Sequence, residues 1–148
     1  MSGNVKEFSG ENKKIFKIHP IGYVENSFFE SDDPEKIRKE DSHIVIYPEY
    51  EEGLYRIEEY EFLNVIFYFH KSSGYSLKRK RREGEIKGVF ASRSPHRPCP
   101  LGLTLVKLMK RERNRLKVKG LDAINGTPVL DIKPYVEKID SVSLHQNF

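Results

Sequence analysis

Short strand-like runs, interrupted repeatedly by proline or glycine, constrain the fold of this chain more than any other feature. The clearest is residues 63–69, a nearly continuous β-branched and aromatic stretch that predicts a buried central strand. Further mixed or alternating runs lie at residues 15–24, 43–47, 89–91, 103–109, 116–119 and 128–135. Many short strands with frequent breaks predict a small, mainly β, open or closed barrel formed by a single domain.

Helices are expected to be short and few, one or two in all. Leu54 and Ile57 lie at helical spacing within residues 53–62, which predicts a small accessory helix. Residues 33–41 are charged and fit a loop or one ragged helical turn, while the charged segment 110–115 predicts the turn of a hairpin. Neither a Gly-x-Gly-x-x-Gly fingerprint nor a P-loop is present, so the fold is not expected to be of the Rossmann type.

The length of the chain and its cysteine content limit the class of protein to which it can belong. The chain has 148 residues, and we expect a barrel at 15–140 between flexible tails at 1–14 and 141–148. Its apolar runs are all much shorter than the roughly 20 residues of a membrane helix. Cys99 is the only cysteine, which predicts a cytoplasmic protein without disulfides, and the five histidines offer no zinc-type spacing. We therefore expect neither a membrane nor a metal among its partners.

Charge is unevenly distributed along the chain. Residues 71–119 contain sixteen Lys and Arg against three Glu, a net charge of +13, so the remainder carries −9 within the overall +4. Such segregation favours a polyanionic partner, nucleic acid first, over simple solvated loops. Two basic runs and the loop between them provide the RNA-binding candidates Lys78, Arg79, Lys80, Arg81, Arg82, Arg97, Arg111 and Arg113.

The loop between the basic runs, within residues 88–105, holds Arg93, His96 and Arg97 among three prolines. Each proline fixes φ at about −65° and removes a backbone donor, so the segment fits neither a helix nor a central strand. A stiff loop lowers the entropy cost of holding cationic side chains against a ligand, and a rigid surface connection is the alternative. Cys99 is close to His96 in sequence, but the stiff chain disfavours a nucleophile–base pair, so a packing role is favoured.

A second polar cluster lies at residues 120–135. Asn125 and Gly126 form a turn dipeptide, which Asp122 precedes. Alternating residues of a strand share one face, and one such set combines an acid, an amine and a phenol: Asp131, Lys133 and Tyr135. Leu130 and Ile132 would take the other face. The set fits an active-site row, and an exposed strand face with an ordinary ion pair is the equal alternative.

Both stretches resemble the signatures of a known family. Residues 88–104, Gly-Val-Phe-Ala-Ser-Arg-Ser-Pro-His-Arg-Pro-Cys-Pro-Leu-Gly-Leu-Thr, are similar to the first signature of the TsaA-like, or TrmO, tRNA methyltransferases. Residues 121–135 are similar to the second signature, and residues 21–24, 52–54 and 67–70 to weaker marks nearer the N-terminus. The resemblance covers roughly residues 15–140, and two long motifs in the right order make it specific.

The resemblance implies a small β-barrel, usually a homodimer, that binds S-adenosyl-L-methionine. It also implies methylation of N6 of threonylcarbamoyladenosine at position 37, in the anticodon loop of tRNA. The implied cofactor contacts are Pro34, Glu35, Lys36, His70, Lys71, Arg93, Leu103, Leu121, Asp122, Ala123, Ile124, Asn125, Gly126 and Thr127. Candidates to accept the N6 proton are Asp122 and Asp131, and His96 and Tyr135 are further catalytic candidates.

Three departures from the family pattern bear on these expectations. A Pro-Arg-Gln element is not visible near Pro34, Cys99 replaces a common Asn, and the chain ends soon after the expected barrel, without the C-terminal domain of longer bacterial members. The basic runs are then candidates to hold tRNA instead of that domain. Two other functions stay open: methylation of another RNA or of a small molecule, and a cofactor- or RNA-binding module without catalysis.

Overall fold

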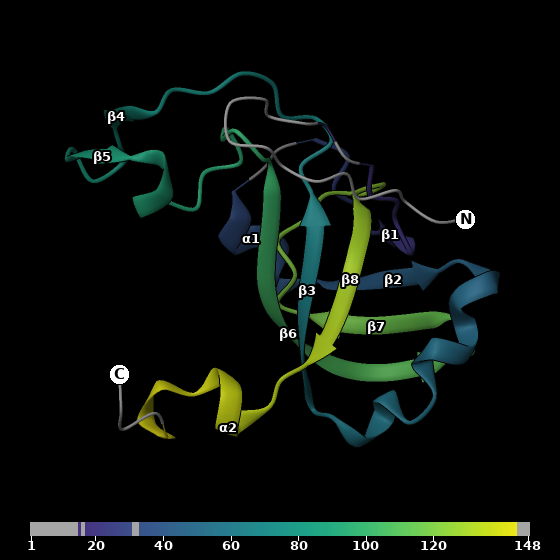
Figure 1. The fold of residues 1–148 in the computed structure, drawn as a ribbon. Coiled ribbons are helices and arrows are strands. Elements are labelled where there is room, and N and C mark those ends of the chain that lie inside the picture. Colours follow the sequence, from purple (N-terminus) through teal and green to yellow (C-terminus); the bar gives the residue numbers. More distant parts are fainter. Residues whose placement is uncertain (1–14, 16, 31–32, 145–148) are drawn as a thin grey trace.

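A computed structural model describes residues 15, 17–30 and 33–144 of the chain. Six strands close into a barrel in the order β1-β2-β7-β6-β3-β8 (Figure 1). They are β1 Gly22–Glu25, β2 Asp41–Ile46, β3 Phe62–Tyr68, β6 Leu101–Glu112, β7 Arg115–Lys119 and β8 Pro128–Pro134. All six pairings are antiparallel. The predicted small, mainly β barrel is confirmed.

The hydrophobic core fills the barrel from the inward faces of its strands. Leu63, Val65 and Phe67 alternate inward along β3 and are at most 1% exposed, so the predicted central strand is confirmed. The other strands contribute buried aliphatic side chains to the same cluster, among them Val106 and Leu116. Full burial of such a side chain contributes about 1.5–3 kcal/mol, so these inward residues supply most of the hydrophobic stabilisation.

The long strand β6 serves two neighbours. Its first half pairs with β3, from Leu101 opposite Tyr68 onward, and its second half pairs with β7. The register shifts at a bulge between Leu108 and Lys110, and bulges bend a strand and increase its twist. The predicted hairpin is confirmed, but its turn is shorter than residues 110–115, because β6 continues to residue 112 and Arg113, at φ 53°, lies in the turn.

The helical elements are short. α1 Pro34–Lys39 forms where the sequence predicts a loop or a ragged turn, and α2 Glu137–Asp140 and the 3-10 helix η4 Val142–Leu144 follow the barrel. The predicted helix within residues 53–62 is wrong, because two 3-10 helices, η1 Pro48–Leu54 and η2 Ile57–Glu59, surround Arg56 in a left-handed conformation. Among the described residues, no helix is long and apolar enough to cross a membrane.

A two-stranded ribbon projects from one end of the barrel (Figure 1). It consists of β4 Lys78–Lys80 and β5 Ile86–Gly88, which pair only with each other. The predicted strand at residues 89–91 is wrong, since the 3-10 helix η3 Val89–Ala91 begins where β5 ends. The predicted strand at residues 15–24 is too long: β1 begins at Gly22, after Pro20, and Ile15 and Ile18 are exposed. The predicted tail at 1–14 lies outside the described residues.

One irregularity of β8 decides which of its residues face the core. The register shifts so that Val129 pairs with Phe67 and Asp131 with Ile66, which leaves Leu130 as the extra residue of a bulge. Val129 and Ile132 therefore reach the core, while Leu130 does not belong to it. Asp131 and Lys133 lie on the outer face, where their side chains form a 2.9 Å ion pair. This face of β8 therefore matches the second alternative, an exposed strand face with an ordinary ion pair.

Candidate functional site

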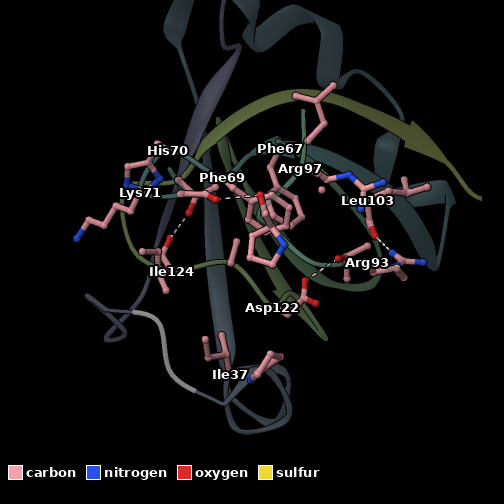
Figure 2. Close-up of a pocket in the computed structure, with 18 of the residues that line it drawn as sticks. Ile37, Phe67, Phe69, His70, Lys71, Arg93, Arg97, Leu103, Asp122 and Ile124 are labelled. Atoms are coloured by element: carbon pink, nitrogen blue, oxygen red, sulfur yellow. Dashed lines mark hydrogen bonds between the residues drawn. The ribbon is translucent and has the colours of Figure 1, made fainter. Parts of the chain in front are cut away.

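A pocket of about 460 Å³ opens at the end of the barrel where β3 ends and β6 begins (Figure 2). Its walls come from α1, from the segment 122–127 and from residues 92–100, which we call the Arg-Pro loop. The volume lies within the roughly 300–1,000 Å³ of small-molecule sites. The two stretches that the sequence singles out therefore meet here, although most of β6 and all of β7 lie between them in the chain.

Two aromatic rings form the apolar floor of the pocket. Phe67 and Phe69 are packed edge to face, with ring centroids 5.1 Å apart. The ring of Phe67 lies against Gly102, its partner on β6, and a Cβ atom on Gly102 would come within 2.4 Å of that ring. The floor therefore requires glycine at position 102, because any larger residue must displace Phe67.

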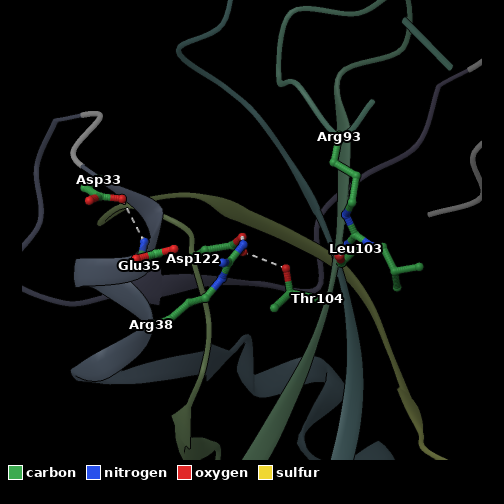
Figure 3. Close-up of polar contacts among 7 residues, drawn as sticks. All are labelled: Asp33, Glu35, Arg38, Arg93, Leu103, Thr104 and Asp122. Atoms are coloured by element: carbon green, nitrogen blue, oxygen red, sulfur yellow. Dashed lines mark hydrogen bonds and ion pairs between the residues drawn. The ribbon is translucent and has the colours of Figure 1, made fainter. Parts of the chain in front are cut away.

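Asp122 is held by two neighbours on different elements (Figure 3). Thr104 donates its hydroxyl to Asp122 Oδ1 at 2.6 Å, and Arg38 of α1 donates to Oδ2 at 2.7 Å. The Asp122 side chain is 19% exposed and that of Arg38 is 49% exposed, so solvent screens the ion pair mainly on the Arg38 side. Both carboxylate oxygens are engaged, and the ion pair fastens α1 to the segment 122–127.

Helix α1 owes its position to one apolar residue and two terminal residues. Ile37 is 2% exposed and lines the pocket, which turns one face of this short helix toward the barrel. Asp33 caps the helix, with its Oδ1 accepting from the backbone N–H of Glu35 at 3.1 Å, and Pro34 occupies the first turn, where its missing N–H costs nothing. The burial of Ile37 against the barrel therefore stabilises this short helix.

Backbone carbonyls fix the guanidinium groups of the Arg-Pro loop. Arg93 donates to the carbonyl of Leu103 on β6 (Figure 3), and Arg97 donates to the carbonyl of Ser92 at 2.9 Å. Both arginines line the pocket. A guanidinium carries five N–H donors in a planar fork, so each side chain keeps further donors that can bind a carboxylate or a phosphate.

Hydrogen bonds around Ser72 assign the tautomer of His96. Ser72 Oγ lies 2.9 Å from the carbonyl oxygen of Pro95 and 3.0 Å from His96 Nδ1. A carbonyl only accepts, so the single hydroxyl proton of Ser72 goes to Pro95 and Nδ1 of His96 donates to Ser72. In this tautomer Nε2 is the accepting nitrogen. His96 lines the pocket, so its Nε2 can accept a hydrogen bond from a substrate.

His70 and Lys71 form the rim beyond the floor (Figure 2). Burial, helped by the positive charge of Lys71, lowers the pKa of His70 below its ordinary value, so the ring is neutral at pH 7. Lys71 donates to the carbonyl of Phe29 at 2.8 Å. The described residues contain no group of three His, Cys, Asp or Glu side chains that would hold a metal ion.

The structure brings many of the predicted site residues into the pocket. From the predicted cofactor set, these are Pro34, His70, Lys71, Arg93, Leu103, Asp122, Ala123, Ile124 and Thr127. The catalytic candidates His96 and Asp122 also line it, as does Arg97 from the RNA-binding set. Five residues of the cofactor set are not among the lining residues: Glu35, Lys36, Leu121, Asn125 and Gly126. Leu121 is fully buried in the core, and Asn125 Oδ1 accepts the Asn26 N–H at 3.0 Å.

Two catalytic candidates, Asp131 and Tyr135, are not among the lining residues. Strand β8 leads away from the pocket end of the barrel, so its later residues lie toward the opposite end (Figure 1). Asp131 is paired with Lys133, and Tyr135 packs edge to face against Phe62 with centroids 6.4 Å apart. The sequence places these residues on one strand, but the direction of that strand relative to the pocket is a property of the whole barrel.

Sequence reasoning misses several residues that line the pocket. They are Ile37, Arg38, Phe67, Phe69, Ser72, Pro95, Leu101, Gly102 and Thr104. Gly102 and Thr104 lie inside the first motif stretch, and alternation along β6 gives a signal that both face inward. Arg38 lies in a charged segment, where no local pattern distinguishes it from its neighbours.

The RNA-binding candidates lie in different surroundings. Lys78, Arg79, Lys80 and Arg82 are exposed on the ribbon. Arg81 is partly buried and donates to the carbonyl of Lys87 at 3.4 Å. On the barrel, Arg111 pairs with Glu58 at 2.8 Å, and Arg113 lies in the β6–β7 turn.

Both the sequence and the fold of this chain match known proteins. The family described as tRNA-methyltransferase O N-terminal domain matches residues 26–141, which include every residue that lines the pocket. An S-adenosyl-L-methionine-binding protein of Archaeoglobus fulgidus is 43% identical over 130 residues, covering 85% of this chain and 94% of that protein. A human tRNA (adenine(37)-N6)-methyltransferase is 38% identical over 139 residues, covering 82% of this chain and 30% of that enzyme.

Among solved structures, the crystal structure of TrmO from Pseudomonas aeruginosa matches with a TM-score of 0.73 at 33% sequence identity. The match covers 89% of this chain and 61% of that one. The chain therefore spans nearly the whole archaeal relative, under two thirds of the bacterial structure and under a third of the human enzyme.

Proposed function

The chain belongs to the tRNA-methyltransferase O family, and from this premise we propose that it is an S-adenosyl-L-methionine-dependent tRNA methyltransferase. The proposed acceptor is N6 of threonylcarbamoyladenosine at position 37, in the anticodon loop. The observation that carries this proposal is the pocket, because both motif stretches converge on one cavity of about 460 Å³ within the matched residues.

The chemistry of the pocket suits such a methyl donor. The cofactor combines an adenine ring, a sulfonium cation and an amino-acid end, so its site needs apolar surface, an anion and donors for a carboxylate. Phe67 and Phe69 supply the apolar surface, and Asp122 supplies the anion. Arg93 and Arg97 keep N–H donors that can bind a carboxylate bidentately. When bound, the cofactor supplies the electrophilic methyl group.

The contribution of the protein chain to this reaction is orientation. Holding two reactants in line can lower the barrier by about 7–11 kcal/mol. Hydrogen bonds within the protein hold the side chains of the pocket in place, since Arg93 is tied to the Leu103 carbonyl and Asp122 to Thr104. Preorganised groups need no costly rearrangement when the reactants meet.

Methyl transfer to N6 also requires that N6 lose a proton, and two catalytic candidates line the pocket. Both oxygens of Asp122 are engaged, at 2.6 Å and 2.7 Å, so proton acceptance there displaces a hydrogen-bond partner. Nε2 of His96 is an acceptor that needs no such displacement, because its partner nitrogen Nδ1 carries the contact with Ser72. We therefore place proton acceptance at His96 Nε2. A positioned base of this kind contributes about 10²–10⁴-fold in rate.

A homodimer and a cytoplasmic location are part of the proposal. The outer face of β6 leaves Leu103 and Leu105 about half exposed, with Met109 beyond Lys107 on the same face, and exposed apolar patches commonly mark interfaces. Leu103 also lines the pocket, so a second copy on this face would lie beside the site. The location follows from the tRNA substrate and from Cys99, which is free.

One alternative is favoured by a specific observation. The Archaeoglobus fulgidus relative, which this chain spans almost entirely, is named for cofactor binding alone. A binding module, or a methyltransferase for another RNA or a small molecule, would bind the cofactor without methylating this tRNA.

Purified protein, methyl-labelled cofactor and tRNA with or without the threonylcarbamoyl group separate these functions. We expect label to enter the modified tRNA alone. We expect His96→Ala to lower turnover by about 10²–10⁴-fold while cofactor affinity changes little. Tight cofactor binding without transfer to threonylcarbamoylated tRNA would contradict the proposed reaction and favour the binding module.

A further inference from the structure

We infer that the β4–β5 ribbon, with its two connections, is the arm that grips a single-stranded loop of the RNA substrate. The second basic run, on the barrel wall, takes no part in that contact. The inference rests on the proposed function and deepens it by assigning the surface that binds the RNA. We call residues 75–90 the arm and the basic side chains of β6 and β7 the wall.

The arm begins and ends at the pocket. Ser72 lines the pocket and leads directly into the arm, and η3 at the other end leads directly to Arg93, which lines the pocket again. Val89 is 1% exposed and its N–H donates to the Leu77 carbonyl at 2.8 Å, which joins the two connections of the ribbon to each other. Figure 1 shows the ribbon projecting beyond the end of β3. RNA held along the arm therefore lies at the rim of the pocket.

The cations of the arm are not neutralised by neighbouring acids. Lys78, Arg79, Lys80 and Arg82 are exposed, and they form no ion pair within the part of the chain that the structure describes. The two acids of the arm, Glu83 and Glu85, lie 3.8 Å and 3.5 Å from Lys87 instead. Four uncompensated positive charges on one narrow ribbon attract a polyanion.

Six basic side chains lie on the wall, and acids pair with five of them, while Lys119 forms no ion pair among the described residues. The five pairs join Lys107 to Glu61 at 3.7 Å, Lys110 to Glu112 at 2.6 Å, Arg111 to Glu58 at 2.8 Å, Arg115 to Glu25 at 2.8 Å and Lys117 to Asp41 at 3.5 Å. Hydrogen bonds from Arg115 and Lys110 lower the pKa of Glu25 and Glu112, so these acids stay charged. A phosphate that approaches one of the paired wall cations must displace a carboxylate, whereas a phosphate that approaches the arm meets free cations.

Exposed apolar side chains lie among the free cations of the arm. Tyr75, Leu77, Ile86 and Phe90 are 55%, 64%, 69% and 80% exposed. Proteins read unpaired RNA bases by stacking them on aromatic rings. Free cations track a phosphate backbone, and the rings of Tyr75 and Phe90 offer platforms for bases. This combination fits the loop of an RNA better than a duplex or an acidic protein.

Two charge-matched variants test the assignment. Lys78→Gln with Lys80→Gln removes two lysines from the arm, and Lys110→Gln with Lys117→Gln removes two from the wall. The readout is tRNA binding by fluorescence anisotropy over a salt series. The arm variant should bind more weakly, and its slope of log affinity against log salt should become shallower by about 1.4, or 0.7 for each lost phosphate contact on a single strand. The wall variant should keep the wild-type slope.

A third variant separates stacking from charge. Phe90→Ala should weaken tRNA binding about fivefold or more, as expected for the loss of one stacked base, and leave the salt slope unchanged. Calorimetric titration with S-adenosyl-L-methionine checks that all variants keep a folded pocket.

The outcomes distinguish failure of the arm from failure of the proposed function. If the arm variant keeps the wild-type slope while the wild type methylates tRNA, the arm assignment is overturned and the function stands. An equal loss of slope in the wall variant overturns the distinction between the two runs. A change in oligomeric mass without a change in slope shows that the arm contacts a second copy, which also overturns the assignment. A wild type that neither binds nor methylates tRNA overturns both proposals.

Discussion

Gly102 is the residue at which barrel packing and the candidate site are most closely coupled. A Cβ atom there meets the ring of Phe67 at 2.4 Å, and that ring is part of the pocket floor. We expect Gly102→Ala to destabilise the fold by about 1–3 kcal/mol through overpacking, and to weaken cofactor binding because the floor moves. Urea unfolding measures the first effect and calorimetric titration the second.

Gly53 provides the matched control for Gly102. It lies in η1, where a Cβ atom meets nothing within 4 Å. Gly53→Ala should leave cofactor binding unchanged and stabilise the protein by up to about 1 kcal/mol, because alanine restricts the unfolded chain. Equal behaviour of the two variants would show that Phe67 adapts without cost.

His70 gives the pocket a dependence on pH. Burial and Lys71 lower its pKa in the folded state, so the native protein holds this proton less readily than the unfolded chain does. The free energy of unfolding is therefore unaffected well above the ordinary histidine pKa of about 6.5, and it falls as pH drops through that value. His70→Gln should reduce this loss, as measured by urea unfolding at pH 7.5 and 5.5. An identical loss in the variant contradicts the assignment.

At the scale of elements, α1 forms one side of the pocket, and a single ion pair fastens it to the segment 122–127. Arg38 reaches Asp122 at 2.7 Å, yet its side chain is about half exposed, so we expect the pair to contribute little to global stability, about 0–1 kcal/mol. Arg38→Gln should instead weaken cofactor binding several-fold, because α1 is then held less firmly at the side of the pocket. Calorimetric titration and thermal unfolding separate the two effects.

Arg56 supplies a control for Arg38. It forms an ion pair of the same length with Glu59, 2.7 Å, in an exposed position between η1 and η2 that does not line the pocket. Arg56→Gln should leave cofactor affinity unchanged. Equal losses in both variants would mean that the effect of Arg38 is not local.

Elements differ in how far the sequence predicts them. Strand β3 is predictable because a run of β-branched and aromatic residues has few alternatives to a buried strand. Helix α1 is not, since six residues with Ile37 as their one buried side chain carry no periodic signal, and tertiary contacts stabilise them. The spacing of Leu54 and Ile57 fits an α-helix and two 3-10 turns equally well, and Arg56 at φ 67° decides between them.

The residues of the pocket also differ in how far the sequence predicts them. Arg93, His96 and Asp122 lie in stretches that proline and turn chemistry make visible in the sequence. Arg38 and Phe67 enter the pocket only because the closed barrel brings α1 and the end of β3 to the same opening. Such long-range placement has no local sequence signal.

At the scale of the whole molecule, the outer face of β6 predicts self-association. Leu105 is 48% exposed and points away from the core, and it is not among the residues that line the pocket. Leu105→Arg should shift the protein from dimer to monomer in light scattering coupled to size exclusion. Tyr55→Arg, at a position 80% exposed between η1 and η2, is the control and should stay dimeric. A monomeric wild type removes this face as an interface.

In the function that we propose, the pocket serves methylation of one nucleoside in tRNA. Mass spectrometry of the nucleosides at position 37, from cells with and without the gene for this chain, tests it most directly. We expect N6-methylated threonylcarbamoyladenosine with the intact gene, and only the unmethylated nucleoside without it or with His96→Ala in its place. The same amount of methylated nucleoside in all three would contradict the proposed function.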